Sequence, residues 1–175
     1  MRLEYGNLVL RHAVAADSQT LADWWNDGSV MAHAGFPNGL GTTAEKVRTQ
    51  LAADTDEMGR RLIIEWMQRP IGEMNYRNLG NGTAEIGIKI CDASCREKGL
   101  GRTVLSMLIR YLFATGYTRI VLDTNLENKR AQHVYELLGF RKLRVNPNSW
   151  TGQLGRPQSS VDYALTEKEF VDFSR

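Results

Sequence analysis

The sequence that decides the fold is Arg96-Glu97-Lys98-Gly99-Leu100-Gly101-Arg102, which lies between a predicted strand and a long predicted helix. Two glycines at alternate positions allow the backbone to approach a ligand closely and to adopt positive φ angles. The start of the following helix offers unpaired N–H groups and the positive end of the helix dipole, which both attract phosphate. Arg96, Lys98 and Arg102 add positive charge at the same place. The segment therefore predicts a pyrophosphate-binding loop rather than a tight turn with solvated charges.

The glycine spacing separates this loop from two common nucleotide-binding loops. A Walker loop has the pattern Gly-x-x-x-x-Gly-Lys-Ser/Thr, and the dinucleotide fingerprint has the pattern Gly-x-Gly-x-x-Gly. Residues 96–101 have the pattern Arg-x-x-Gly-x-Gly and match neither. Two glycines alone would be weak evidence, so the interpretation depends on the three basic residues at a predicted helix start.

Strand and helix signals alternate on both sides of the loop. The preceding strand, Thr83 to Cys91, has period-two alternation, which places its side chains on two faces of a sheet. One face carries Ala84, Ile86, Ile88 and Ile90, and the other carries Glu85, Gly87, Lys89 and Cys91. The helix after the loop has an apolar stripe and ends at Gly116. A strand from Arg119 to Thr124 and a helix that ends at Gly139 follow.

The remaining elements are predicted from apolar patterns, turns and helix caps. Asp17 is the expected N-cap of a first helix, and Thr42 with Glu45 has the spacing of a capping box for a second helix through about Leu51. Thr166 and Glu169 repeat that spacing before a short terminal helix. The other predicted strands are Leu8–Ala13, Arg61–Gln68, Ile71–Arg77, and a hairpin of Phe140–Val145 and Val161–Leu165 around a long loop, Asn146–Ser160.

The order of these elements is β-α-α-β-β-β-α-β-α-β-β, which implies a mixed sheet with helices packed on it, an α/β architecture. A chain of 175 residues is enough for one ordinary domain, and no segment has the composition of an interdomain linker. We therefore expect a single domain over residues 1–175.

Composition restricts the class of protein. Hydrophobic residues make up 42% of the chain and charged residues 24%, which argues against disordered and fibrous classes. Lys and Arg number 22 against 20 Asp and Glu, and a net charge of +2 is too small for a nucleic-acid binder. No apolar stretch approaches the length of a membrane span, and Met1 to Tyr5 has no apolar signal core. We expect a cytoplasmic protein with no nucleic-acid or membrane partner.

Two motifs resemble those of GNAT-type N-acetyltransferases. Arg96-x-x-Gly99-x-Gly101, after the strand Ala84-Glu85-Ile86-Gly87-Ile88, resembles the coenzyme A motif of that family. Residues Asn128 to Phe140 match a second pattern, Asn-x-x-Ala-x-x-x-Tyr-x-x-x-Gly-Phe. The resemblance covers the whole chain in the order of its elements. The run Trp25 to Asp27 further resembles the branch that contains ribosomal-protein N-terminal acetyltransferases.

The resemblance implies a fold and a donor site. In this family two central parallel strands splay apart, and the pantetheine arm of acetyl-CoA lies in the gap. Mapped onto this sequence, the backbone of Ile88, Lys89 and Ile90 would contact the arm, and Asn128 would contact it near the second strand. The loop Arg96 to Arg102 would hold the pyrophosphate.

The implied reaction is direct attack of an amine on a thioester, which requires no covalent nucleophile and no metal. Tyr135 matches the family tyrosine and is the candidate general acid, although it also lies on an apolar stripe where a core tyrosine is ordinary. Glu85 is the candidate base, through water, because it shares a face with Gly87, whose missing side chain leaves room for substrate. The alternative for Glu85 is a solvated carboxylate, and Glu73 is the reserve base.

The acceptor end of the site is expected near the first helices. His33 and Phe36 are the candidate acceptor-binding residues, together with Glu73. Cys91 and Cys95 are interpreted as small, partly buried residues beside the loop rather than as reactive thiols. Because only these two cysteines and three scattered histidines occur, we expect no metal site.

The sequence therefore predicts an acetyl-CoA-dependent N-acetyltransferase. Its partners would be acetyl-CoA and a primary amine, either the N-terminus of a peptide or protein or a small molecule. A homodimer is compatible with this prediction. The alternative is a non-catalytic acyl-CoA-binding sensor or interaction module on the same fold.

Overall fold

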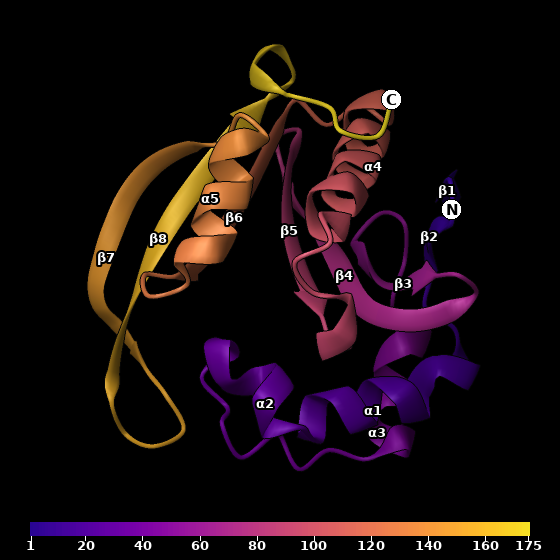
Figure 1. The fold of residues 1–175 in the computed structure, drawn as a ribbon, viewed down its shortest axis with the longest axis vertical. Helices are drawn as coiled ribbons and strands as arrows, with labels where there is room; N and C mark the ends of the chain where they lie inside the picture. Colours follow the sequence, from indigo (N-terminus) through magenta and orange to yellow (C-terminus); the bar gives the residue numbers. More distant parts are fainter.

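The computed structural model describes residues 1–175, and its backbone hydrogen bonds form one sheet of eight strands (Figure 1). Only β5 and β6 are parallel, and every other neighbouring pair is antiparallel. The expected α/β fold with a mixed sheet is confirmed. In spatial order the strands are β1 (Arg2–Tyr5), β2 (Leu8–His12), β3 (Gly59–Trp66), β4 (Arg69–Gly80), β5 (Thr83–Ile90), β6 (Arg119–Asn125), β8 (Pro157–Thr166) and β7 (Arg141–Thr151).

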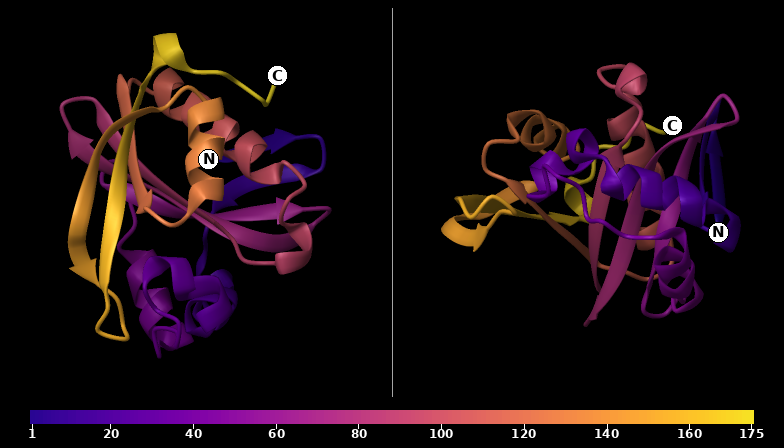
Figure 2. Two further views of the ribbon diagram at one scale, coloured as in Figure 1. Left: turned by 60° about the vertical axis from the view of Figure 1, so that its left-hand side comes forward. Right: turned by 90° about the horizontal axis from the view of Figure 1, so that it is seen from below.

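Helices cover both faces of this sheet (Figure 2). The helices α4 and α5 pack with six strands into a cluster of 25 buried residues, whereas α1 to α3 pack over Ile63 in a second cluster of 7. None of the helices is both long and apolar enough to cross a bilayer. The helices are α1 (Ser18–Asn26), α2 (Gly28–Met31), α3 (Ala44–Ala52), α4 (Leu100–Ala114) and α5 (Lys129–Leu137), with single 3-10 turns at Ala15–Asp17, Ala32–Ala34, Ala93–Cys95 and Glu167–Glu169.

The helix α4 fixes the position of the glycine loop. Its predicted apolar stripe is buried against the sheet along its whole length, and burial of each large aliphatic side chain contributes about 1.5–3 kcal/mol. Gly99 precedes the first helical residue at φ 75°, in the left-handed region that glycine adopts readily. The loop therefore enters the helix in one fixed conformation. The stripe consists of Val104, Leu105, Leu108, Ile109, Leu112 and Phe113.

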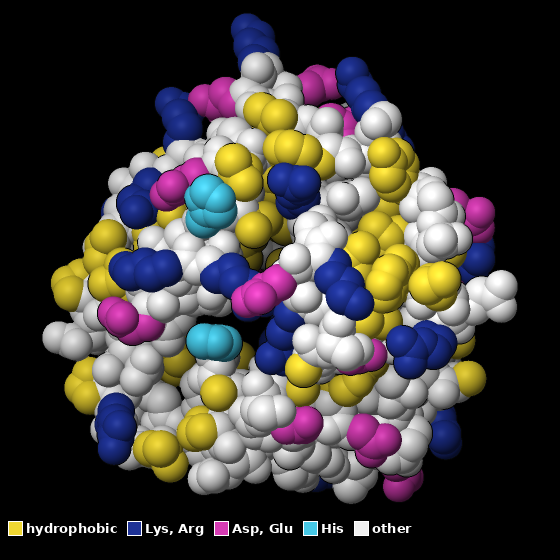
Figure 3. All heavy atoms as spheres, viewed as in Figure 1, with side chains coloured by type: hydrophobic (Ala, Val, Ile, Leu, Met, Phe, Trp, Pro, Cys, Tyr) yellow, Lys and Arg dark blue, Asp and Glu magenta, His cyan; other side chains and the backbone are white.

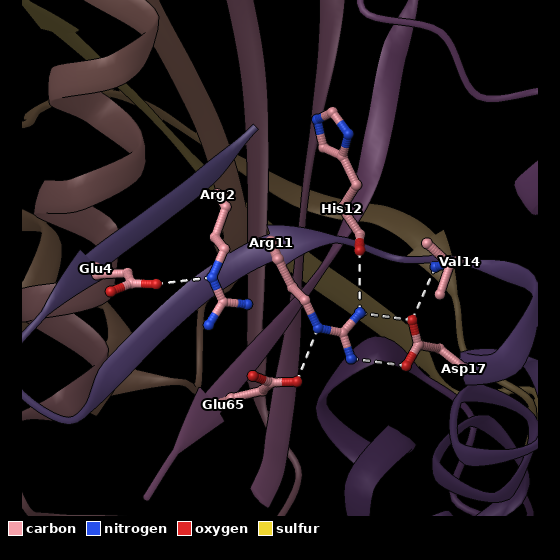
Figure 4. Close-up of polar contacts among 7 residues, drawn as sticks. All are labelled: Arg2, Glu4, Arg11, His12, Val14, Asp17 and Glu65. Atoms are coloured by element: carbon pink, nitrogen blue, oxygen red, sulfur yellow. Dashed lines mark hydrogen bonds and ion pairs between the residues drawn. The ribbon is translucent and has the colours of Figure 1, made fainter. Parts of the chain in front are cut away.

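Asp17 occupies the predicted N-cap position of α1. Its carboxylate, however, makes no capping bond to that helix. Instead it accepts two hydrogen bonds from Arg11, at 2.7 and 2.9 Å, and one from the Val14 amide at 2.8 Å (Figure 4). Burial raises the pKa of Asp17, but the bonds from Arg11 and Val14 outweigh this and lower it overall. Arg11 also donates to Glu65 on β3 at 2.7 Å, so this cluster ties the start of α1 to the sheet.

Two further helix starts show what capping-box spacing can and cannot predict. Thr43, not Thr42, caps α3 and accepts a bond from the Lys46 amide at 3.3 Å, because Thr42 is held by two bonds to Asn26. The predicted box at Thr166 is present, with Glu169 accepting from its amide and hydroxyl. The helix after it is only one 3-10 turn.

The prediction of a long loop over Asn146–Ser160 was wrong. Residues 141–151 and 157–166 form the paired strands β7 and β8, which leaves only 152–156 as the connection. The pairing continues through Asn146↔Ser160 and Trp150↔Gln158, with irregularities between. Polar residues fill this stretch, and the bulged strand interrupts the period-two pattern that would have revealed it. The strand β1, which pairs with β2, was also missed.

Two glycines that end helices allow a matched stability test. Gly116 (φ 104°) and Gly139 (φ 95°) both follow a helix in the left-handed region, as the sequence predicted for helix ends. A Cβ at Gly116 meets nothing within 4 Å, whereas one at Gly139 lies 1.9 Å from the backbone oxygen of Glu169.

We predict that Gly116→Ala lowers the free energy of unfolding by about 1–2 kcal/mol, the cost of the left-handed conformation alone. Gly139→Ala should cost clearly more, because the backbone of Glu169 must also move. Urea denaturation measures both, and equal losses in the two variants would contradict the packing described for Gly139.

Candidate functional site

The parallel strands β5 and β6 pair only at one end. Their register covers Thr83↔Arg119, Ala84↔Ile120 and Glu85↔Val121, although β5 continues to Ile90 and β6 to Asn125. Beyond these pairs the strands run apart toward the lower half of Figure 1. The structure thus has the separation of the two central strands that the resemblance implied.

A cleft of about 720 Å³ lies where the two strands separate. Figure 3 shows a hollow on this face with basic side chains and a histidine at its rim. The cleft is lined by residues 87–90 of β5, by 123–125 of β6 and by parts of α2, α4 and α5. Of the predicted donor-site residues, it brings together Ile88, Lys89, Ile90, Arg96, Gly101 and Asn128.

The glycine loop, of which Arg96 and Gly101 line the cleft, has free backbone donors. The amides of residues 97–102 make no hydrogen bond within the protein. A Cβ at Gly101 would meet no atom within 4 Å, so the space beside the first turn of α4 is open. Arg96 Nε donates to the Ile90 carbonyl at 3.2 Å and so holds the loop against the end of β5. Unpaired amides at a helix start form an anion-binding arrangement.

The basic side chains of the loop do not all face this opening. Lys98 Nζ lies 4.9 Å from the ring centre of Trp66, and the Arg102 guanidinium carbon lies 4.9 Å from that of Phe173. Of the three predicted cations only Arg96 lines the cleft. Arg130, which the sequence reasoning did not single out, lines it too and is paired with Glu97 at 3.1 Å. Its position inside the second motif was the available signal.

Tyr135 reaches the cleft from α5. Its ring packs edge-on against Phe140 and Tyr163, with ring centres 5.9 and 5.8 Å away, and the residue is only 6% exposed. Its hydroxyl makes no hydrogen bond, yet no buried side-chain oxygen lacks a partner, so the hydroxyl meets the open cleft. Burial, followed by the charge of Asp123 and by Tyr163, raises the pKa of Tyr135. The phenol is therefore protonated at neutral pH and can donate.

The two predicted carboxylates lie outside the lining of the cleft. Glu85 is ion-paired with Arg77 on β4, with Arg77 Nε at 3.1 Å. Glu73 is buried, and its Oε1 accepts from Trp25 Nε1 at 2.8 Å and from Lys89 Nζ at 3.0 Å. Glu73 therefore orients Lys89, which does line the cleft.

The β7–β8 hairpin reaches one end of the cleft. Of the two aromatic residues expected at the acceptor site, His33 lines the cleft, whereas Phe36 does not and is 38% exposed. Trp150, which the sequence reasoning placed in a loop, lines the cleft and packs so closely on Gly35 that a Cβ there would lie 2.2 Å from its ring. The backbone amide of Gln153 donates a hydrogen bond to the Gly35 carbonyl oxygen at 2.8 Å. The tip of the hairpin thus rests on the loop after α2.

Both cysteines are buried, at 7% and 1% exposure for Cys91 and Cys95. Burial, with a contribution from Glu73, raises the pKa of the Cys91 thiol to about 12. A thiol with that pKa is protonated at neutral pH and is a poor nucleophile. The geometry agrees with a packing role.

Known proteins resemble this chain in sequence and in fold. The model of the acetyltransferase (GNAT) domain matches residues 7–141. A spermidine N-acetyltransferase from Vibrio cholerae, solved with CoA and spermine, is 23% identical with a TM-score of 0.81, covering 93% of this chain and 97% of that one. A ribosomal-protein-S5-alanine acetyltransferase from Vibrio fischeri is 16% identical with a TM-score of 0.83, covering 98% and 99%.

A curated relative, an uncharacterized protein of Methanocaldococcus jannaschii, is 28% identical over 102 residues, which are 53% of this chain. The match spans only 21% of the length of that protein. The domain match covers well over half of this chain and contains both sequence motifs. The chain belongs to the GNAT family of acetyltransferases.

Proposed function

We propose that this protein transfers an acetyl group from acetyl-CoA to a primary amine by direct attack in a ternary complex. The main support for this proposal is that β5 and β6 pair over only three residues each. Beyond them, the edge of β5, the glycine loop with its free amides and the phenol of Tyr135 border one cleft. Membership of the GNAT family supports acetyl-CoA as the acetyl donor. A structural relative from Vibrio cholerae was solved with CoA.

The donor would bind along the cleft in two parts. The amide groups of a pantetheine arm can pair with the free edge of β5 at Ile88 to Ile90, as an added strand does. The pyrophosphate would accept hydrogen bonds from the amides of residues 97–102, with Arg96 and Arg130 beside it. Asn128 caps α5 through Oδ1, which accepts from the Ala131 amide at 3.2 Å, and this leaves its Nδ2 for the arm.

The reaction passes through a tetrahedral oxyanion and expels a thiolate. Free N–H groups on the edge of β5 can stabilise the oxyanion as it forms. The hydroxyl of Tyr135 can protonate the departing sulfur, since it is protonated and reaches the cleft. In this arrangement acetyl-CoA binds beside α5 and the glycine loop. The amine acceptor then approaches from the opposite face of the sheet.

The acceptor would enter between His33 and Trp150, which both line the cleft. The relatives named above are described as acting on spermidine and on a ribosomal-protein alanine. We therefore take polyamines and alanine-initiated peptides as the two acceptor classes to test. A sensor on the same fold would bind acetyl-CoA and acetylate neither.

We predict that Gly101→Val lowers the affinity for acetyl-CoA at least tenfold, because the side chain fills the open space in front of the loop amides. The free energy of unfolding should change by only about 1 kcal/mol, since nothing within 4 Å opposes a Cβ there. Calorimetry and urea denaturation measure the two effects. An undiminished affinity would remove the pyrophosphate from this loop.

Arg96→Ala and Arg102→Ala form a matched pair from one loop. We predict that Arg96→Ala weakens acetyl-CoA binding about tenfold or more and reduces its salt dependence, because a charge-assisted bond is lost. Arg102→Ala should affect binding much less, since its guanidinium lies over Phe173. Equal losses in both variants, measured by calorimetry at two salt concentrations, would contradict this assignment.

Tyr135→Phe should lower kcat about a hundredfold while acetyl-CoA affinity stays near the parent value, as expected for loss of a general acid. Tyr163→Phe is the matched control. Tyr163 belongs to the same aromatic cluster, but its hydroxyl donates to Glu136 at 3.1 Å and lies outside the cleft lining. If both variants keep the parent rate with chemistry limiting, Tyr135 has only a packing role.

A further inference from the structure

The cleft contains a lysine whose hydrogen-bond donors are only partly used by the protein. Lys89 of β5 stands directly opposite Glu73 of β4, and its Nζ donates to Glu73 Oε1 at 3.0 Å. An ammonium group has three donors, and this bond is the only one that Lys89 Nζ makes within the protein. The Lys89 side chain is 31% exposed and lines the cleft. Two of its donors are therefore free to bind a ligand there.

The carboxylate of this pair is held from its other side. Glu73 is only 4% exposed, and its Oε1 also accepts a hydrogen bond from Trp25 Nε1 of α1 at 2.8 Å. A buried carboxylate is costly to leave without a cation, so Glu73 keeps the end of the Lys89 side chain in place. Lys89 is thus a cation of fixed position on the wall of the cleft.

The strand geometry places the Lys89 side chain on the acceptor side of β5. Gly87 and Lys89 share one face of the strand, whereas Ile88 points the other way, toward the cluster formed with α4 and α5. The bonds that hold Lys89 lead to Trp25 of α1, so its face is the one that α1 to α3 cover. In the proposed reaction the amine acceptor approaches from this face. The side chain of Lys89 therefore meets the acceptor.

Charges in the cleft are divided between its two sides. The cations Lys89 and Arg96 belong to β5 and to the segment after it. The carboxylates Asp123 and Glu127 belong to β6 and to the segment after it. Arg130 of α5 also lines the cleft and is paired with a glutamate of the glycine loop. Since Arg96 and Arg130 lie beside the proposed pyrophosphate site, Lys89 is the lysine or arginine that remains for the acceptor.

This division of charge favours one class of acceptor. A polyamine carries several positive charges and would bring a second ammonium toward Lys89, whereas an acceptor with an amine and a carboxylate fits both sides. Neighbouring same-face residues of a strand are about 6.7 Å apart, and an extended peptide advances about 3.3 Å per residue. A peptide whose amine lies beside Gly87, which lines the cleft, thus brings its second or third residue beside Lys89.

We propose that Lys89 selects acceptors that carry a carboxylate close to the reacting amine, namely peptides whose second or third residue is acidic. This rests on the proposed acetyl transfer. The free donors of the Lys89 ammonium bind the carboxylate while the third donor stays on Glu73. Hydrogen bonds between opposite charges are stronger than those between neutral groups, and the same ammonium repels the second charge of a polyamine. Lys89 determines specificity and takes no part in proton transfer.

The test compares three alanine-initiated tripeptide amides, whose second and third residues are both glutamate, both glutamine or both lysine, with spermidine as a fourth acceptor. At saturating acetyl-CoA, kcat/KM should fall from the glutamate to the glutamine to the lysine peptide by about tenfold or more overall, because a charge-assisted bond is replaced by repulsion. Spermidine should be a poorer acceptor than the glutamate peptide. High salt should reduce these differences, since it screens exposed charges.

Two double variants test whether Lys89 itself sets this preference. Lys89→Met alone leaves a buried carboxylate without its cation, so it is combined with Glu73→Gln, whose side-chain oxygen can still accept from Trp25. This double variant should bring the ratio of kcat/KM for the glutamate and lysine peptides close to one. Arg77→Met with Glu85→Gln is the matched control and should keep the parent ratio. It removes another directly opposite pair of β4 and β5, which lies outside the cleft lining.

The outcomes separate this inference from the proposed function. Equal kcat/KM for the three peptides, a preference for spermidine, or an equal loss of the ratio in both double variants would overturn the role of Lys89 while leaving acetyl transfer intact. If the parent binds acetyl-CoA but acetylates no acceptor, proton NMR titrations of the peptides against the CoA complex decide. Tighter binding of the glutamate peptide that disappears in the Glu73→Gln/Lys89→Met variant supports the inference, and equal binding of the three peptides contradicts it.

Discussion

The rest of the site depends on one constraint, which is that the pairing between β5 and β6 stops after three residue pairs. Both strands remain paired on their outer edges, β5 with β4 as far as Ile90 and β6 with β8 as far as Asn125. Their mutual pairing covers only Thr83–Glu85 of β5 and Arg119–Val121 of β6, and the residues that follow line the cleft. Their inner edges therefore keep unpaired N–H and C=O groups that need a partner. Water can provide one, and an extended ligand with amide groups can replace it.

The opening joins two unlike environments. Beneath it lie α4 and α5, with the aromatic cluster that surrounds Tyr135 and raises its pKa by burial. On the other face the register gathers polar side chains, among them Asn75 and Asp123. The protonated phenol of Tyr135 and the unpaired carboxylate of Asp123 thus lie on opposite sides of one cleft.

Sequence reasoning predicted the features that local signals determine. Period-two alternation, helix-ending glycines and the loop before α4 appear where the sequence placed them. It failed where residues distant in the sequence determine the orientation of a side chain. Lys98 packs on Trp66, Arg102 packs on Phe173, and Glu85 pairs with Arg77 on the neighbouring strand. The approach of Trp150 to the cleft depends on pairing between β7 and β8 through a bulged polar stretch, which no short pattern reveals.

Amide hydrogen exchange with and without acetyl-CoA reports on the free backbone donors themselves. We predict that acetyl-CoA slows exchange at the amides of residues 97–102 and at those on the inner edge of β5 between Ile86 and Ile90. Exchange in β2 and β3, which pair on both sides, should be unchanged. Tight acetyl-CoA binding without protection at these two segments would contradict it.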